Sequence, residues 1–274
     1  NLVSGGATGG VTGVFVRDLL LGVTELVSVG PSGPANADSG RPSISGDGRV
    51  VAFQSRATNL GTAPSTLAWN VFVRNRPLGF TALASPAFPE PLLAPPVSGD
   101  RDSQNPKVSA DGRYVAFESR ASNLLPAAMS SISHVYVRDT LTRTTVGVTA
   151  SVPSGFTPFE ANGDSRNASI SDAGRFVAFE SAATNLAPGV ATFSNVYVRD
   201  LVTGAALVAS VGFFPGAANG DSFRPSLSAD GRVVAFESYA TNLTNDRVGG
   251  APHVFARDLF AARTERVSRG PTLP

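Results

Sequence analysis

Short apolar runs, each bounded by Gly, Pro, Asp or Asn, follow one another along the whole chain. Runs such as Val50-Val-Ala-Phe-Gln-Ser55 are rich in β-branched and aromatic residues, as β-strands are. Asp47-Gly48 and Asp111-Gly112 each separate two such runs, and Asp-Gly is a preferred turn of a tight hairpin. No stretch keeps the 3.6-residue apolar period of an amphipathic helix. The pattern therefore predicts an all-β protein.

The sequence repeats itself with a period of about 60 residues. Its first signature is Val-Phe-Val-Arg-Asp or a close variant, which begins at Val14, Val71, Val135, Val196 and Val254. A second signature, Pro42-Ser-Ile-Ser-Gly-Asp-Gly-Arg-Val-Val-Ala-Phe53, recurs around Arg113, Arg175 and Arg232. A third, Ala-Thr-Asn-Leu or Ala-Ser-Asn-Leu, begins at Ala57, Ala121, Ala183 and Ala240. Four complete copies and a leading half copy account for nearly every residue.

Each copy predicts four short strands, A to D, and four-stranded units of this length are typical of β-propeller blades. Strand A carries Pro-Ser-x-Ser, strand B Val-Ala-Phe, strand C Val-Phe-Val-Arg-Asp, and strand D follows a short turn. We therefore expect one propeller domain over 1–274, with a half repeat at 1–30 and repeats at 31–86, 87–152, 153–211 and 212–274. This predicts antiparallel four-stranded blades, about five in number, or six if upstream residues are missing. The half repeat lacks strands A and B, which upstream residues or another chain would supply.

At these motifs the chain resembles the TolB-type WD40-like (PD40) repeats of bacterial β-propellers. The resemblance rests on Pro-Ser-x-Ser-x-Asp-Gly-Arg-x-Val-Ala-Phe, together with the Ala-Thr-Asn-Leu and Val-Phe-Val-Arg-Asp segments, and it covers almost the whole chain. It implies a propeller fold, and for function it implies a scaffold, a binding module or an accessory domain of an enzyme. Many relatives carry an acidic loop before strand C that looks able to bind calcium. Here only Asn245-Asp246 remains of it, so we expect no calcium site.

Composition narrows the classes of partner. The 22 basic and 21 acidic side chains nearly cancel, which argues against nucleic acid as a partner. No apolar run is long enough to span a bilayer directly. The chain has no Cys, which excludes disulfides and thiolate metal sites, and we expect no metal and no cofactor. It begins at Asn1, so we expect a processed or incomplete chain. We also expect a bacterial periplasmic or extracellular location, which includes attachment to the membrane periphery.

Charged residues recur in strands B and C, and we interpret them as structural ion pairs across the two strands. A catalytic group is not usually copied once per blade, and Gln54 replaces Glu in the first copy. The expected pairs are Glu118 with Arg138, Glu180 with Arg199, and Glu237 with Arg257. His134 and His253 share one position before strand C, where other copies have Gly or Asn. They are expected to make loop-end hydrogen bonds, and no catalytic residue is assigned.

An Asp-Ser pair precedes strand A in every complete copy, where the chain approaches the centre of a propeller. A ring of carboxylates at the channel mouth could hold a cation or a basic peptide tail. The alternative is that Asp-Ser makes a local turn that fixes how one blade follows the next. The members are Asp38, Asp102, Asp164 and Asp221.

The loops divide into two faces by length. The A–B and C–D turns are short and lie on one face, the tight-turn face, whereas the long B–C and D–A loops lie on the other, the long-loop face. The long loops hold many apolar residues, and such a surface usually marks a partner site. Packing of these residues on one another is the alternative. The candidate partner face consists of Trp69, Phe88, Leu92, Leu93, Phe156, Phe159, Phe213 and Phe214.

Three functions are consistent with these features of the sequence. The first is a non-enzymatic, exported propeller that serves as a structural or docking subunit and binds protein through its long-loop face, within a larger cell-envelope or membrane-associated assembly. The second is a carbohydrate-binding or glycan-processing propeller with its site at the channel mouth. The third, an accessory domain of a hydrolase, needs a catalytic domain outside these residues. Exposed apolar loops would favour protein docking, and exposed aromatic residues beside carboxylates at the axis would favour glycan binding.

Overall fold

The computed structural model describes residues 10–61, 68–91, 94–151, 159–187, 192–213, 216–246 and 251–268. The chain divides into two compact units. Unit 1 comprises Asn1–Ser131, Tyr136–Gly147 and Val152–Pro158, and unit 2 comprises Ile132–Val135, Val148–Ser151 and Phe159–Pro274. No helix occurs among the described residues, so these residues contain no helix long and apolar enough to cross a membrane.

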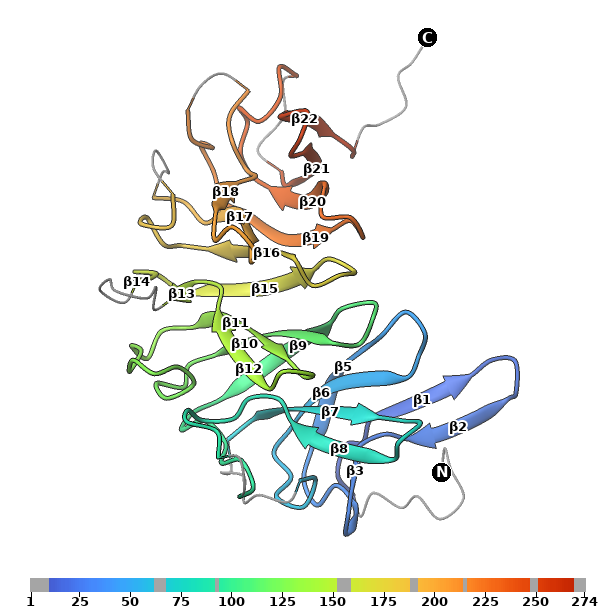
Figure 1. Ribbon diagram of the computed structural model, residues 1–274. Coiled ribbons are helices and arrows are strands. Elements are labelled where there is room, and N and C mark those ends of the chain that lie inside the picture. The colour runs from blue at the N-terminus through green and yellow to red at the C-terminus, as the bar shows by residue number, and fades with distance from the viewer. Residues whose placement is uncertain are drawn as a thin grey trace. The chain divides into compact units, whose positions relative to one another are not determined.

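Besides one small two-stranded hairpin, unit 1 contains a two-stranded sheet and two four-stranded sheets, with the strands of each sheet adjacent in chain order (Figure 1). The first two residues of β11 belong to unit 2. The half repeat forms β1 (Phe15–Asp18) and β2 (Val23–Leu26), and a small hairpin follows as β3 (Val29–Gly30) and β4 (Gly33–Pro34). The next repeat forms β5 (Ser39–Ile44), β6 (Val50–Ser55), β7 (Asn70–Asn75) and β8 (Phe80–Leu83). The third sheet consists of β9 (Ser103–Val108), β10 (Tyr114–Ser119), β11 (His134–Asp139) and β12 (Thr144–Gly147).

Unit 2 contains the last two repeats, each again a sheet of four antiparallel strands in chain order. A short hairpin of β13 (Ala150–Ser151) and β14 (Phe159–Glu160) comes first. The fourth sheet consists of β15 (Ser165–Ile170), β16 (Phe176–Ser181), β17 (Asn195–Asp200) and β18 (Ala206–Val208). The fifth consists of β19 (Ser222–Leu227), β20 (Val233–Ser238), β21 (His253–Asp258) and β22 (Arg263–Arg266).

The repeated Ala-Phe of strand B forms the core of each blade. The alanine side chains at this position in the second to fourth sheets are fully buried, as is each neighbouring phenylalanine. In every four-stranded sheet the Phe of strand B stacks on an aromatic residue of strand C, with ring centroids 5.6–6.1 Å apart. These pairs are Phe53–Phe72, Phe117–Tyr136, Phe179–Tyr197 and Phe236–Phe255.

The Arg that follows the A–B turn anchors the end of strand C. Arg113 binds Asp139 with Nη2 and Oδ2 2.7 Å apart, and Arg175–Asp200 and Arg232–Asp258 repeat this contact at the same distance. The guanidinium of Arg113 lowers the pKa of Asp139 to about 2. Since both partners belong to one sheet, the ion pair fixes the blade's tight-turn end.

The architecture agrees with the sequence prediction at the level of the sheets. The protein is all-β, with antiparallel four-stranded sheets that fit propeller blades, and the first strands of neighbouring sheets lie close together within each unit. No pairing among the described strands closes the array, so the number of blades stays a prediction. The single-domain assignment over 1–274 also stays a prediction.

Candidate functional site

The first strand of every complete repeat is interrupted at one position by a β-bulge. The register shifts between Gly40 and Ser43 in β5, and at the matching place in the other first strands. The residue at the bulge has a left-handed backbone although it is not glycine, which is uncommon and costs about 1 kcal/mol or more. These residues are Arg41, Asn105, Asn167 and Arg224, with φ of 49°, 53°, 53° and 52°.

A side chain of strand B in the preceding repeat, Gln54 or Glu180, accepts a hydrogen bond from the backbone of this bulge. The backbone N–H of Asn105 donates to Oε1 of Gln54 at 3.1 Å, and that of Arg224 donates to Oε2 of Glu180 at 2.8 Å. Glu180 also accepts from Nε of Arg166 at 2.5 Å, and its side chain is almost entirely buried. The repeated Glu therefore links the first strands of two neighbouring blades.

The predicted pairing of strand-B Glu with strand-C Arg is wrong. Glu180 stands opposite Val196, whereas Arg199 stands opposite Val177, three residues away along β16. Because neighbouring residues of a strand alternate between the two faces of the sheet, Glu180 and Arg199 point to opposite faces. The register of β20 and β21 separates Glu237 from Arg257 in the same way.

The remaining predicted pair, Glu118 with Arg138, has other partners in the structure. Nδ2 of Asn105 donates to Glu118 at 2.8 Å, and Arg138 binds Glu90 and Thr145. Arg199 and Arg257 are partly buried on the other face, where desolvation lowers the pKa of both.

The Asp of each Asp-Ser pair connects one repeat to the next. Its Oδ1 accepts a hydrogen bond of 2.7–2.8 Å from a backbone N–H of the preceding repeat. The donor is the residue two positions before the first Val of strand C. The following Ser donates its backbone N–H to the carbonyl of that same residue. The contacts are Asp38–Thr12, Asp102–Trp69, Asp164–Ser133 and Asp221–Ser194. This clamp accounts for the recurrence of Asp-Ser, and a ligand for the ring of carboxylates stays a prediction.

Within unit 2 the bulges border a cavity of about 470 Å³ at the long-loop end of β15 and β19. Arg166 and Arg224 stand at it with side chains 61% and 69% exposed. Phe223 and Tyr239 form an aromatic pair with ring centroids 5.6 Å apart, and the Arg224 guanidinium lies 5.7 Å from the Phe223 ring. The lining is completed by Asn167, Glu180, Ser194 and Asp221. The cavity thus offers cationic groups beside an accessible aromatic surface.

Of this lining, sequence reasoning had singled out Asp221 and Glu180 but missed Arg166, Phe223, Arg224 and Tyr239. The missed residues lie beside the recognised motifs, one or two residues before the Pro-Ser or Ala-Ser of strand A and directly after strand B. The available signal was a polar residue at the position before Pro42, Pro106 and Pro225 in three of the four copies. Residues before proline disfavour the right-handed helical region, but nothing in Arg or Asn specifies the left-handed one.

The predicted partner face can be followed only in part. Leu92, Leu93, Phe156 and Phe214 lie outside the described residues, and the side chain of Phe159 is not described. Phe88 and Phe213 are about half exposed, whereas Trp69 is partly buried, with the Arg56 guanidinium 4.9 Å from its ring centre. The long loops therefore expose aromatic surface where they are described.

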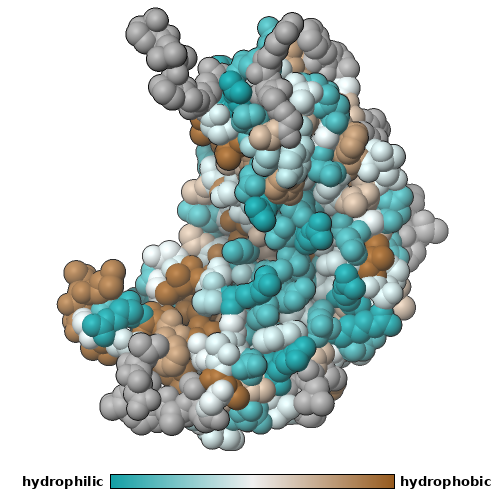
Figure 2. Space-filling model, turned by 180° about the vertical axis from the view of Figure 1, so that it is seen from behind, coloured by the Kyte–Doolittle hydropathy of each residue, from teal (hydrophilic) through white to brown (hydrophobic). Residues whose placement is uncertain are grey.

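The tight-turn face also exposes apolar surface, which the sequence analysis did not anticipate. Every C–D turn with a described tip carries an exposed aliphatic or aromatic side chain. The tip of the β1–β2 hairpin is visible as the brown projection at the left of Figure 2. The residues, 72–98% exposed, are Leu19, Leu20, Leu21, Leu78, Leu141, Val202 and Phe260.

The two histidines have structural surroundings. His134 is fully buried, and its Nε2 lies 2.9 Å from Oε1 of Glu160. Burial lowers the pKa of His134, and the contact with Glu160 opposes that shift. Nδ1 of His253 lies 3.3 Å from Oγ of Ser268. Across the described residues, no three His, Asp or Glu side chains gather in a way that could hold a metal ion.

No model of a known protein family matches the sequence. No curated protein matches it either. The structure is similar to TolB from Acinetobacter baumannii, with 15% identity and a TM-score of 0.51 over 93% of this chain and 48% of that one. Putative TolB from Agrobacterium tumefaciens gives the same identity and TM-score over 89% of this chain and 69% of that one. The chain thus spans about half of the first TolB and shares a TolB-like propeller fold.

The expectation that the chain is not an enzyme is wrong as it was stated. Chains of similar fold include oligogalacturonate lyase from Vibrio parahaemolyticus, which is 10% identical over 95% of this chain and 61% of that one, with a TM-score of 0.49. A prolyl endopeptidase and a puromycin hydrolase are also among them. A propeller fold by itself does not decide between binding and catalysis.

Proposed function

We propose that the chain is an exported binding propeller that holds an acidic segment of a protein partner at the long-loop face of unit 2. The observation that carries this is the cavity where Arg166 and Arg224 stand exposed beside the Phe223–Tyr239 pair. Aromatic residues and Arg are enriched at protein interfaces and dominate their binding energy. Phe193 and Phe213, both exposed, extend the aromatic surface on the long loops of the same unit.

The charge arrangement favours a carboxylate as the contacting group. Glu180 binds Nε of Arg166 and lies within the wall, while the Arg166 side chain as a whole is largely exposed. Arg224 approaches Glu237 only at 3.3 Å, and both side chains are accessible. An incoming carboxylate can therefore form charge-assisted hydrogen bonds with Arg224 without displacing a buried pair. We propose a periplasmic or extracellular location for this binding, in an assembly that includes the membrane periphery.

A selection of displayed peptides on the full chain tests the proposal. We expect peptides that combine Asp or Glu with an apolar residue, and we expect Arg224→Ala and Tyr239→Ala each to weaken their binding at least tenfold, as interface anchors do. Arg263→Ala is the matched control, because Arg263 is equally exposed at the tight-turn end of the same unit. Peptides without acidic residues, or binding unchanged in both variants, would contradict the proposal.

An acidic glycan is the second candidate ligand, because Phe223 and Tyr239 form an aromatic platform close to Asp221 and Glu180. Exposed aromatic residues beside carboxylates are the combination expected of a sugar site. Titration of the same variants with an acidic oligosaccharide separates the two cases. Saturable oligosaccharide binding that Tyr239→Ala abolishes, together with a failed peptide selection, would replace the protein partner by a glycan.

A further inference from the structure

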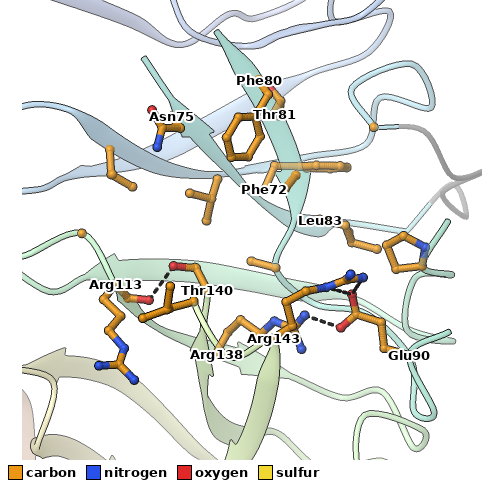
Figure 3. Close-up of a pocket in the computed structure, with 18 of the residues that line it drawn as sticks. Phe72, Asn75, Phe80, Thr81, Leu83, Glu90, Arg113, Arg138, Thr140 and Arg143 are labelled. Atoms are coloured by element: carbon orange, nitrogen blue, oxygen red, sulfur yellow. Dashed lines mark hydrogen bonds and ion pairs between the residues drawn. The ribbon is translucent and has the colours of Figure 1, made fainter. Parts of the chain in front are cut away.

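Unit 1 contains a second and larger cavity, of about 640 Å³, between the sheet β5–β8 and the sheet β9–β12. Figure 3 shows Phe72, Phe80 and Leu83 along one wall and Arg138, Thr140 and Arg143 along the other. Most of the lining is apolar, and its strand residues come mainly from the sheet β5–β8, with Arg138 from β11. A cavity of this size and character is typical of small-molecule sites.

At two positions that line the cavity, unit 1 carries smaller side chains than the matching pair of repeats in unit 2. In unit 2 the first position of β16 is Phe176, whose ring leaves no room for a Cβ at Gly231. Phe176 and Leu259 both pack against the core of unit 2. In unit 1 the corresponding residues of the repeat are Val50, which faces Gly112, and Thr140, and both line the cavity. Smaller side chains at these two positions occupy less of the space between the sheets than Phe and Leu would.

At one end of the cavity, two arginine side chains face a single glutamate. Glu90 reaches in from the loop after β8 and binds both Arg138 and Arg143, with Nε of Arg143 3.0 Å from its Oε1. The Arg138 side chain is only 5% exposed and that of Glu90 13%. Arg113 is neutralised separately by Asp139. Asp111, the other carboxylate of the lining, accepts from the backbone N–H of Arg113 at 3.0 Å. At the Arg138–Arg143 end two guanidinium groups thus share one carboxylate, which leaves one positive charge at that end.

We propose that this cavity binds an amphipathic monocarboxylate, with an acyl or aromatic body between the two sheets and its carboxylate at the Arg138–Arg143 end. Burial of the apolar body removes it from water and supplies the driving force. The carboxylate balances the remaining charge of the two guanidinium groups, which bind carboxylates in charge-assisted pairs. A ligand without the acid would leave that charge at the edge of an apolar space.

Isothermal titration of the full chain with decanoate below its micellar concentration tests the proposal, with decanol as the uncharged probe. We expect saturable decanoate binding at one site and at least tenfold weaker binding of decanol. Arg143→Gln should weaken decanoate binding several-fold and leave decanol unchanged. The double variant Val50→Phe, Thr140→Leu should abolish decanoate binding while the melting temperature stays the same or rises, since it restores the packing found in unit 2.

Val233→Phe places the same side chain at the equivalent position of the last repeat, outside the cavity, and should bind decanoate as the unaltered chain does. Thr140→Leu alone is the smaller change if the double variant does not fold, and it should weaken binding without loss of stability. Absence of saturable decanoate binding would overturn the proposal. Binding that survives filling of the cavity, or equal affinity for decanol, would also overturn it.

Discussion

His134 shows how one residue of a repeat can depart from its equivalents without any catalytic role. Asn70 and Asn195 occupy the same position in other repeats and, like His134, are buried. The imidazole contacts Glu160 at 2.9 Å and lies within the field of Asp164, yet burial lowers its pKa. Over some range of pH, His134 is therefore neutral in the folded protein and protonated in the unfolded chain.

This difference predicts a pH dependence of stability. Because the folded pKa lies below the unfolded value of about 6.5, the contribution of neutral His134 is present above that value and is lost as the pH falls through the folded pKa. We expect the melting temperature to fall more between pH 7 and pH 5 for the unaltered chain than for His134→Asn. Thermal melts of both proteins at the two pH values measure this. An equal fall in both would show that His134 is protonated in the folded protein.

At the scale of the elements, the Asp-Ser clamp predicts a contrast between two substitutions of Asp164. The contact with Ser133 uses one carboxylate oxygen as an acceptor of a backbone hydrogen bond. Asn keeps such an oxygen, so Asp164→Asn should change stability little, whereas Asp164→Ala should cost about 1 kcal/mol. Urea unfolding of the two variants measures the difference. If Asp164→Asn destabilises the protein as much as Asp164→Ala, the negative charge matters and the clamp is not the reason for this Asp.

The sequence predicted the strands and hairpin turns but not the contacts between strands B and C. Asp-Gly turns define the A–B hairpins, because only a few turn types close so short a loop. Strands B and C are joined by long loops, which do not fix a register, and a shift by one residue exchanges the two faces. Glu180 and Arg199 therefore looked like a pair although they lie on opposite faces. The bulges at Arg41 and Arg224 were equally hidden, since an extra residue breaks the alternation on which strand prediction depends.

At the scale of the whole molecule, repetition predicted the buried residues well and the exposed ones poorly. A residue such as Phe53 recurs because every blade needs the same core, and it is fully buried. The candidate site in unit 2 depends instead on what differs between repeats, since Phe223 and Tyr239 have no aromatic equivalents in the second sheet. The cavity of unit 1 is likewise lined by Val50 and Thr140, where the matching pair of repeats in unit 2 has the bulkier Phe176 and Leu259. Residues shared by all repeats build the core, whereas residues that differ between repeats line the two candidate sites.

The exposed apolar tips of the C–D turns give a last prediction that holds in both units. Leu259 and Phe260 are neighbours in one turn, but Leu259 packs against the core of unit 2 whereas Phe260 is 78% exposed. Leu259→Ala should therefore cost about 2 kcal/mol, and Phe260→Ala should change stability by less than about 0.5 kcal/mol. Leu141, at the same turn position in unit 1, is 73% exposed, and Leu141→Ala should behave like Phe260→Ala.

Urea unfolding measures these stabilities, and retention on a hydrophobic-interaction column measures the exposed surface. Phe260→Ala and Leu141→Ala should shorten retention because each removes an accessible apolar side chain. A large loss of stability in either variant would mean that the tips are packed in solution and that the tight-turn face is covered. If stability is unchanged and retention is shortened, the tight-turn face is an open apolar surface. A partner could then contact either the long-loop face or the tight-turn face.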